Sequence, residues 1–135
     1  MGLTYNPAVF DVDDLLAAMR IILTPEDSST EVRWKTETPY LADLTGQWIE
    51  ITRQSLLLDY GCGVGRMAKE LIVRHACRVI GVDISPSMRA LAPMYVASDR
   101  FFACPPAMLD GLIERGVRFD GALSVWVLQH CLNPA

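Results

Sequence analysis

The sequence contains no apolar run long enough to cross a lipid bilayer. Its longest apolar stretches lie around residues 56–58 and 122–128, far short of the roughly 20 residues that a membrane-spanning helix needs. The first ten residues also lack the basic region and the following apolar run of a secretory signal. We therefore expect a cytoplasmic protein that has no membrane partner.

Positive charge is scarce as well. The chain has 12 Lys and Arg against 16 Asp and Glu, which gives a formal net charge of −4 and a pI of about 5.0. Because nucleic acids are bound by clustered Lys and Arg side chains, this balance argues against nucleic acid as a partner. A local basic patch is still compatible with it.

The cysteines lack the spacing of a metal site. No two of Cys62, Cys77, Cys104 and Cys131 lie two or three residues apart, and neither histidine completes a ligand pattern. Each cysteine lies in or beside an apolar segment. We therefore expect reduced, buried thiols and no bound metal.

The apolar content indicates one packed domain over residues 1–135, because 51% of the chain is hydrophobic. Residues 1–50 are predicted to be an N-terminal helical segment. Apolar positions at helical spacing predict a first helix that begins at Asp11 or Asp13 and ends before Pro25. A polar loop is expected over residues 26–35, and Thr38 is expected to cap a second helix.

From Ser55 onward, short apolar segments alternate with helical patterns. The predicted strands cover residues 56–58, 78–82, 100–104 and 119–128. The predicted helices cover residues 66–75, residues 85–91 up to a stop or kink at Pro93, and residues 107–115, followed by Gly116 as a cap. This alternation, with strands that are apolar on both faces, indicates an α/β fold with a parallel sheet covered by helices on each side.

The most informative segment follows the first predicted strand. Asp59 ends this strand, and glycines at positions 61, 63 and 65 lead into a helix. Glycine permits positive φ and close approach of the backbone to a ligand, and ligands of open α/β sheets bind beyond the carboxyl ends of the strands. Asp83 ends the next strand, where a carboxylate can accept hydrogen bonds from the two hydroxyls of a ribose.

The glycine spacing favours one kind of nucleoside ligand. A dinucleotide site has the pattern G-x-G-x-x-G and holds a pyrophosphate, whereas this loop is G-x-G-x-G with an acid two residues before it. Asp59 would repel a pyrophosphate and attract an ammonium or a sulfonium group. A nicotinamide-dependent or nucleotide-sugar oxidoreductase is the less favoured alternative.

Three segments resemble the motifs of class I S-adenosylmethionine-dependent methyltransferases. Residues 56–66 resemble the first motif, residues 79–88 the second, and residues 119–130 the motif on the fourth strand, within a similarity that covers residues 33–134. The resemblance implies S-adenosyl-L-methionine as cofactor and S-adenosyl-L-homocysteine as product. It also implies a C-terminally truncated Rossmann-like sheet in the order 3-2-1-4, without the family's strands 5–7.

The resemblance implies cofactor contacts for nine residues. The backbone of the loop would wrap the methionine part through Gly61, Cys62, Gly63 and Gly65. The carboxylate of Asp59 would face the ammonium group, and that of Asp83 would bind the ribose hydroxyls. The adenine would pack on Ile84 and Met88, and the backbone near Val125 would reach the methionine end. Two roles are open for Arg66: a contact with the cofactor carboxylate or, as the favoured expectation, a side chain that faces solvent from the following helix.

Two departures from the family pattern have consequences. No carboxylate or amide stands at the end of the third strand, at residues 101–108, so backbone groups and packing are expected to recognise the adenine. The fourth strand would be a sheet edge, and residues 122–127 carry no charge that would protect such an edge. We therefore expect a homo-oligomer whose second copy covers it.

The predicted function is methyl transfer to a small-molecule acceptor. His130 follows the fourth strand and is a candidate general base, and Gln129 is a candidate for orienting the acceptor. Structural roles remain open for both side chains. The alternative from another class is a module or fragment that binds the cofactor but is catalytically incomplete.

Overall fold

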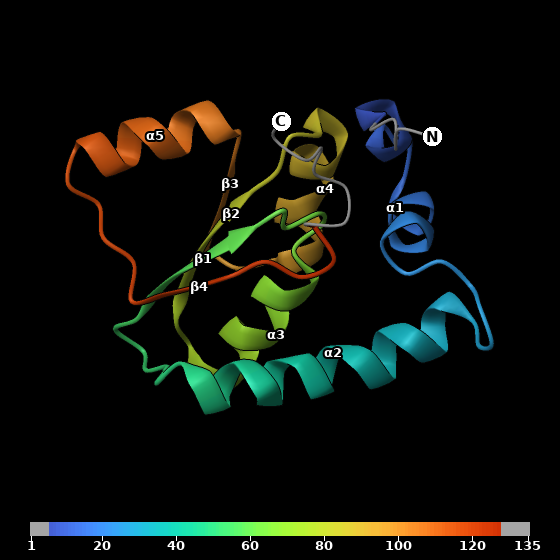
Figure 1. Ribbon diagram of the computed structural model, residues 1–135, viewed down its shortest axis with the longest axis horizontal. Helices are drawn as coiled ribbons and strands as arrows, with labels where there is room; N and C mark the ends of the chain where they lie inside the picture. Colours follow the sequence, from blue (N-terminus) through green and yellow to red (C-terminus); the bar gives the residue numbers. More distant parts are fainter. Residues whose placement is uncertain (1–5, 128–135) are drawn as a thin grey trace, which may run out of the picture.

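The sheet of the computed structural model, which describes residues 6–127, has four parallel strands (Figure 1). They are β1 (Leu56–Tyr60), β2 (Arg78–Val82), β3 (Phe101–Cys104) and β4 (Gly121–Leu123). Their order is β3-β2-β1-β4. Leu58 of β1 stands in register with Ile80 of β2 on one side and with Ala122 of β4 on the other. The predicted order 3-2-1-4 is confirmed.

Helices cover both faces of this sheet. The first face bears α3 (Arg66–His75) and α4 (Pro86–Val96), and side chains of α3 pack there with Leu57 and Val79. The other face bears α5 (Pro106–Glu114), whose Leu109 packs with Val82 and Cys104. Since alternate residues of a strand point to opposite faces, β1 and β2 contribute to both cores. The α/β prediction is therefore confirmed (Figure 1).

The N-terminal segment comprises the 3-10 helix η1 (Pro7–Phe10), α1 (Leu15–Ile22) and α2 (Thr30–Trp48). The cap of α1 is Asp14, not Asp11 or Asp13, because the Ala17 amide donates to Asp14 Oδ1 at 2.8 Å. These elements pack on α4 and the glycine loop through a core of Ala18, Leu23, Trp34, Val64 and Met88.

The predicted loop over residues 26–35 was wrong in its second half. Ser29 caps α2, and its hydroxyl accepts a hydrogen bond from the Val32 amide at 3.3 Å. Trp34 is only 8% exposed, so tertiary packing of this first turn outweighs its polar composition. As a result, the proline at position 39 lies inside the helix and not at its start.

Two other boundaries differ from their predictions. The helix α4 continues through Pro93 to Val96, whose side chain is buried in the core beside α3. The strand β4 covers only three residues of the predicted 119–128, and Trp126 shortly after it has φ +60°. A left-handed residue of this size does not continue a strand.

Three of the four cysteines lie in the described part of the chain. Cys62, Cys77 and Cys104 are buried free thiols, as expected, and Cys131 lies outside the described residues. Within residues 6–127, no helix combines the length and the apolar character that a membrane span requires.

Candidate functional site

The glycine loop lies directly after β1, and its backbone is anchored to the end of β2. Gly61 and Gly63 have φ values of +76° and +55°, a region that side chains with a Cβ rarely adopt. The amides of Gly61 and Cys62 both donate to the Val82 carbonyl, at 2.7 and 3.0 Å. The loop is therefore held at the carboxyl ends of two neighbouring strands, where ligands of such sheets bind.

Asp83 is the second anchor of this loop. Its Oδ2 accepts a hydrogen bond from the Gly63 amide at 2.8 Å, and its Oδ1 accepts one from the Ser85 amide at 2.9 Å. Each carboxylate oxygen can accept about two hydrogen bonds, so both oxygens retain capacity for a donor in the cavity. Asp83 is thus oriented by the backbone before any ligand binds.

Asp59 is a buried carboxylate whose hydrogen bonding is incomplete. It is 3% exposed, and its Oδ2 has no hydrogen-bond partner among the described residues. Burial, helped by the nearby charge of Asp83, raises the pKa of Asp59 to about 7, although Arg66 opposes this shift. A buried charge without a partner is costly, so a cationic or hydrogen-donating ligand would be stabilised here.

Arg66 does not face solvent, contrary to the prediction. Its side chain is 4% exposed and lies with its guanidinium 5.5 Å from the ring centroid of Trp34. It donates to Thr38 Oγ1 at 3.2 Å, and burial lowers its pKa. The position explains the error: Arg66 is the first residue of α3, and its partners Thr38 and Trp34 belong to α2, which packs against that helix.

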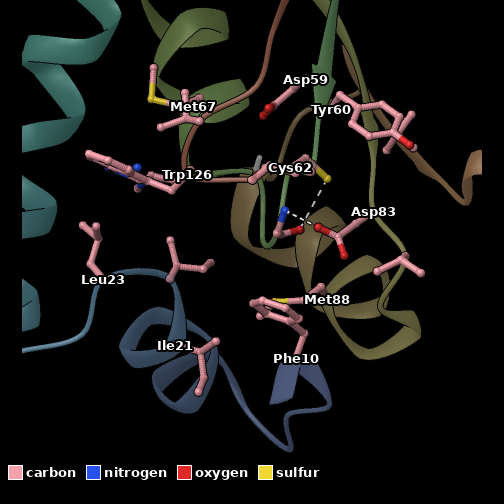
Figure 2. A pocket seen from close by; sticks show the side chains of 18 of the residues that line it. Phe10, Ile21, Leu23, Asp59, Tyr60, Cys62, Met67, Asp83, Met88 and Trp126 are labelled. Carbon is pink, nitrogen blue, oxygen red and sulfur yellow. Dashed lines mark hydrogen bonds between the residues drawn. The ribbon is translucent and has the colours of Figure 1, made fainter. Parts of the chain in front are cut away.

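These groups surround a cavity of about 800 Å³, shown in Figure 2. Small-molecule sites commonly measure about 300–1,000 Å³. Eight of the nine residues predicted to contact a cofactor line it, namely Asp59, Gly61, Cys62, Gly63, Asp83, Ile84, Met88 and Val125. The remaining lining includes the apolar side chains of Trp126 and Val127, which follow Val125 in the fourth-strand motif. It also includes apolar side chains that no sequence motif indicated, namely Phe10, Ile21, Ile22, Leu23 and Met67.

Gly65 is the ninth residue, and it lies away from the cavity. It precedes α3 with φ +85°. A Cβ at this position would collide with Val96 of α4 and would contact Phe101 of β3 at 3.5 Å. The structure therefore places Gly65 where α4 and β3 approach the loop, behind the cavity wall.

The N-terminal segment closes one side of the cavity. The Phe10 carbonyl accepts hydrogen bonds from Ser85 Oγ at 2.7 Å and Ser87 Oγ at 3.1 Å, and the Val12 amide donates to Ser87 Oγ at 3.0 Å. Figure 2 shows Phe10 beside Met88, below Asp83. We call these three hydrogen bonds the serine latch. The sequence suggested Ser85 only as a helix start.

The predicted catalytic residues, His130 and Gln129, lie outside the described residues, so their placement stays a prediction. Among the described groups, the Cys62 thiol is a poor nucleophile, because burial and the charges of Asp59 and Asp83 raise its pKa strongly. No group of three metal-ligating side chains occurs within residues 6–127.

The fold and this arrangement of two acids around a glycine loop define a Rossmann-like methyltransferase domain. A family model described as "Methyltransferase domain" matches residues 58–135. The chain therefore belongs to this family, of the class I S-adenosylmethionine-dependent type.

Individual relatives match parts of the chain. A mitochondrial ubiquinone biosynthesis O-methyltransferase of Arabidopsis thaliana is 32% identical over 83 residues, which is 58% of this chain and 25% of that protein. The chain thus matches about a quarter of this curated relative.

Two solved structures support the fold. A S-adenosylmethionine-dependent methyltransferase from Thiobacillus denitrificans, in complex with S-adenosyl-L-homocysteine, aligns with a TM-score of 0.58 and 14% identity over 89% of this chain and 46% of its own. A TehB-like methyltransferase from Corynebacterium glutamicum aligns with a TM-score of 0.51 and 23% identity over 65% and 45%.

Proposed function

We propose that the chain binds S-adenosyl-L-methionine in the cavity beyond β1 and β2 and takes part in methyl transfer to a small-molecule acceptor. The observation that carries this proposal is the buried Oδ2 of Asp59, which lacks a hydrogen-bond partner among the described residues and belongs to a residue that lines the cavity. A ligand with an ammonium group would supply the missing donor and a compensating charge.

The other residues at the cavity suit the rest of this cofactor. Asp83 stands at the end of β2 with spare acceptor capacity for the two hydroxyls of a ribose. Ile84 and the buried Met88 offer an apolar surface for adenine. Gly61 and Gly63 line the cavity with backbone that has no Cβ and a positive φ, and Val125 lines the same cavity.

The bound cofactor would supply a methyl group on a sulfonium, which is displaced by a nucleophile of the acceptor. The protein's main contribution to such a displacement is to place the acceptor and exclude water. The apolar side chains of α1, together with Met67 and Trp126, form the wall suited to this task (Figure 2). His130 and Gln129 remain the proposed base and orienting residue.

The proposed acceptor is a small molecule, because α1 and η1 enclose the cavity on one side and the chain carries a net charge of −4. A cytoplasmic location and a homo-oligomer that covers the edge of the sheet at β4 are proposed with it. The competing proposal is a module that binds the cofactor without turnover.

Calorimetry with S-adenosylmethionine and S-adenosylhomocysteine tests the proposed binding. Saturable binding is expected for the native chain and for Asp110→Asn, which changes an exposed acid of α5 that does not line the cavity. Asp83→Asn is expected to weaken binding at least tenfold, because hydrogen bonds to a charged acceptor are the strong ones. The proposal fails if both variants bind like the native chain, or if NAD binds better than either ligand. Release of S-adenosylhomocysteine in the presence of an acceptor then separates catalysis from binding alone.

A further inference from the structure

Three arginines lie together at the amino ends of the strands, at the end of the sheet opposite the glycine loop. A second cavity, of about 240 Å³, is lined by Arg53, Gln54, Arg78 and Arg100. None of these side chains is acidic. The charged side chains that line this cavity are therefore all positive, on a chain whose net charge is −4.

The parallel topology brings these arginines together. Arg78 is the first residue of β2, Arg100 directly precedes β3, and Arg53 lies in the turn before β1. The Arg78 amide donates to the Ser55 carbonyl at 3.0 Å, and the Val79 amide donates to the Arg100 carbonyl at 2.9 Å. Adjacent strands are about 4.8 Å apart. The amino ends of three neighbouring strands therefore place their arginines within roughly 10 Å of one another.

The arginines have few partners within the protein. Arg78 Nη2 donates to the Gln54 carbonyl at 3.3 Å. The ion pairs within residues 6–127 involve Arg33 and Arg74 and none of these three arginines. Even Asp99, which adjoins Arg100 in the sequence, is exposed and forms no such pair. Arginine stays charged at all physiological pH values, so the three like charges repel one another until an anion lies between them.

We propose that this cavity is a binding site for a small phosphate-bearing ligand, such as a pyrophosphate or the phosphate end of a nucleotide. The planar guanidinium group presents paired donors that match phosphate oxygens. The volume of about 240 Å³ is below the range of about 300–1,000 Å³ typical of whole drug-sized ligands. It suits a phosphate group or a pyrophosphate, with any remainder of the ligand outside.

This site is separate from the proposed cofactor site. The five residues of β2 place its two ends roughly 15 Å apart at about 3.3 Å per residue, with Arg78 at one end and Asp83 just beyond the other. The two cavities share no lining residue. The result of a binding test at the arginine site is therefore independent of the proposed cofactor binding.

Calorimetry on the whole chain tests the site, with pyrophosphate, inorganic phosphate and ADP as probes at constant ionic strength. The variants are Arg53→Gln/Arg78→Gln/Arg100→Gln and the matched control Arg20→Gln, an exposed arginine of α1 with no partner among the described residues. We expect saturable pyrophosphate binding that the triple variant weakens at least tenfold and the control leaves unchanged. If ADP binds as tightly as pyrophosphate, the phosphates are the recognised group. If pyrophosphate binds no more tightly than inorganic phosphate, the site holds a single phosphate group.

Chemical shifts provide the second measurement. Pyrophosphate is expected to move the guanidinium Nε–Hε signal of Arg100, and Arg100→Lys is expected to bind with intermediate affinity because it retains charge but loses the paired donors. Binding that the triple variant retains in full would place the anion elsewhere and overturn the proposal. An absence of saturable binding by the folded native chain would overturn it as well. The far-ultraviolet circular dichroism of each variant establishes that it is folded.

Discussion

The carboxylate of Asp83 accepts a hydrogen bond from the Gly63 amide at 2.8 Å and so joins the end of β2 to the loop that follows β1. The bond orients the acid and shapes the loop at the same time. The two motifs that the sequence separates by 20 residues therefore act as one structural unit. A change in either residue is expected to affect the other.

Asp59→Asn tests the cost of the buried carboxylate. Burial raises the Asp59 pKa from 3.8 to about 7, so between these values the folded state binds more protons than the unfolded state. The stability of the ligand-free chain should therefore fall as pH rises from about 4 to about 7, by at most about 4 kcal/mol. Asp59→Asn should remove most of this slope in urea unfolding measured across that range. A native chain with a flat profile would contradict the inference.

The affinity for S-adenosylmethionine should depend on pH in the opposite direction. If the ionised form of Asp59 binds the ammonium group, affinity rises as pH increases through about 7 and binding releases a proton. Calorimetry at pH 6.5 in two buffers of different ionisation enthalpy measures that proton. An equal heat in both buffers would show that Asp59 does not change its protonation on binding.

Arg66→Met should shift this pH dependence. Arg66 lowers the Asp59 pKa, so its removal should move the midpoint of the affinity profile to higher pH. Arg66→Lys keeps the charge and should move the midpoint less, although it loses the planar contact with Trp34. The affinity for S-adenosylmethionine, measured against pH in both variants, gives the two midpoints. A midpoint that stays in place for Arg66→Met would show that the two side chains do not interact.

Gly63→Ala should disrupt the loop. Gly63 has φ +55°, and a Cβ there would lie 2.8 Å from Ile22 Cδ1, the end of a flexible side chain that can shift. The backbone strain is therefore the main cost, and it should destabilise the loop by about 1–3 kcal/mol. The matched control is Gly111→Ala on α5, where a Cβ meets nothing within 4 Å and should stabilise the helix by roughly 0.5–1 kcal/mol. Thermal unfolding and cofactor titration of both variants provide the comparison. Equal unfolding temperatures for Gly63→Ala and Gly111→Ala would contradict the inferred strain at Gly63.

Ser87→Ala should loosen the serine latch. Ser87 Oγ bonds both to the Phe10 carbonyl and to the Val12 amide, and each hydrogen bond contributes about 1 kcal/mol. Hydrogen exchange at the Val12 amide should accelerate, and bound S-adenosylhomocysteine should dissociate roughly 5–30-fold faster. Ser28→Ala, an exposed serine before α2, is the control. If exchange at Val12 does not change, the latch does not hold the N-terminal segment.

Much of the α/β core could be predicted from local patterns. The residues 66–75 and 78–82 form the helix and strand that their apolar spacing predicts, because the same side chains that set the pattern are buried in the core. The glycine spacing and the position of Asp83 indicated the loop and its acid, since only a few backbone geometries suit that order of residues.

The start of α2 and the burial of Arg66 depended on contacts between segments distant in sequence, which no local pattern reveals. The polar first turn of α2 is helical because Trp34 is buried and its Nε1 donates to Tyr95 Oη at 2.9 Å, a contact between residues 61 positions apart. Arg66 is buried for the same reason, because Thr38 and Trp34 of α2 pack against it. Sequence periodicity reports which side chains of one helix share a face, but it does not report which helix will cover them.

Strand–loop–helix order and glycine spacing are local properties of the chain, so they were sufficient to predict the class of fold and the identity of the two acids. The tertiary structure buries Asp59 with an oxygen that has no hydrogen-bond partner among the described residues, and it packs Gly65 against α4 and β3. It alone brought Arg53, Arg78 and Arg100 to one cavity. The physical reason is the same in each case: burial and convergence depend on the packing of segments that are distant in sequence.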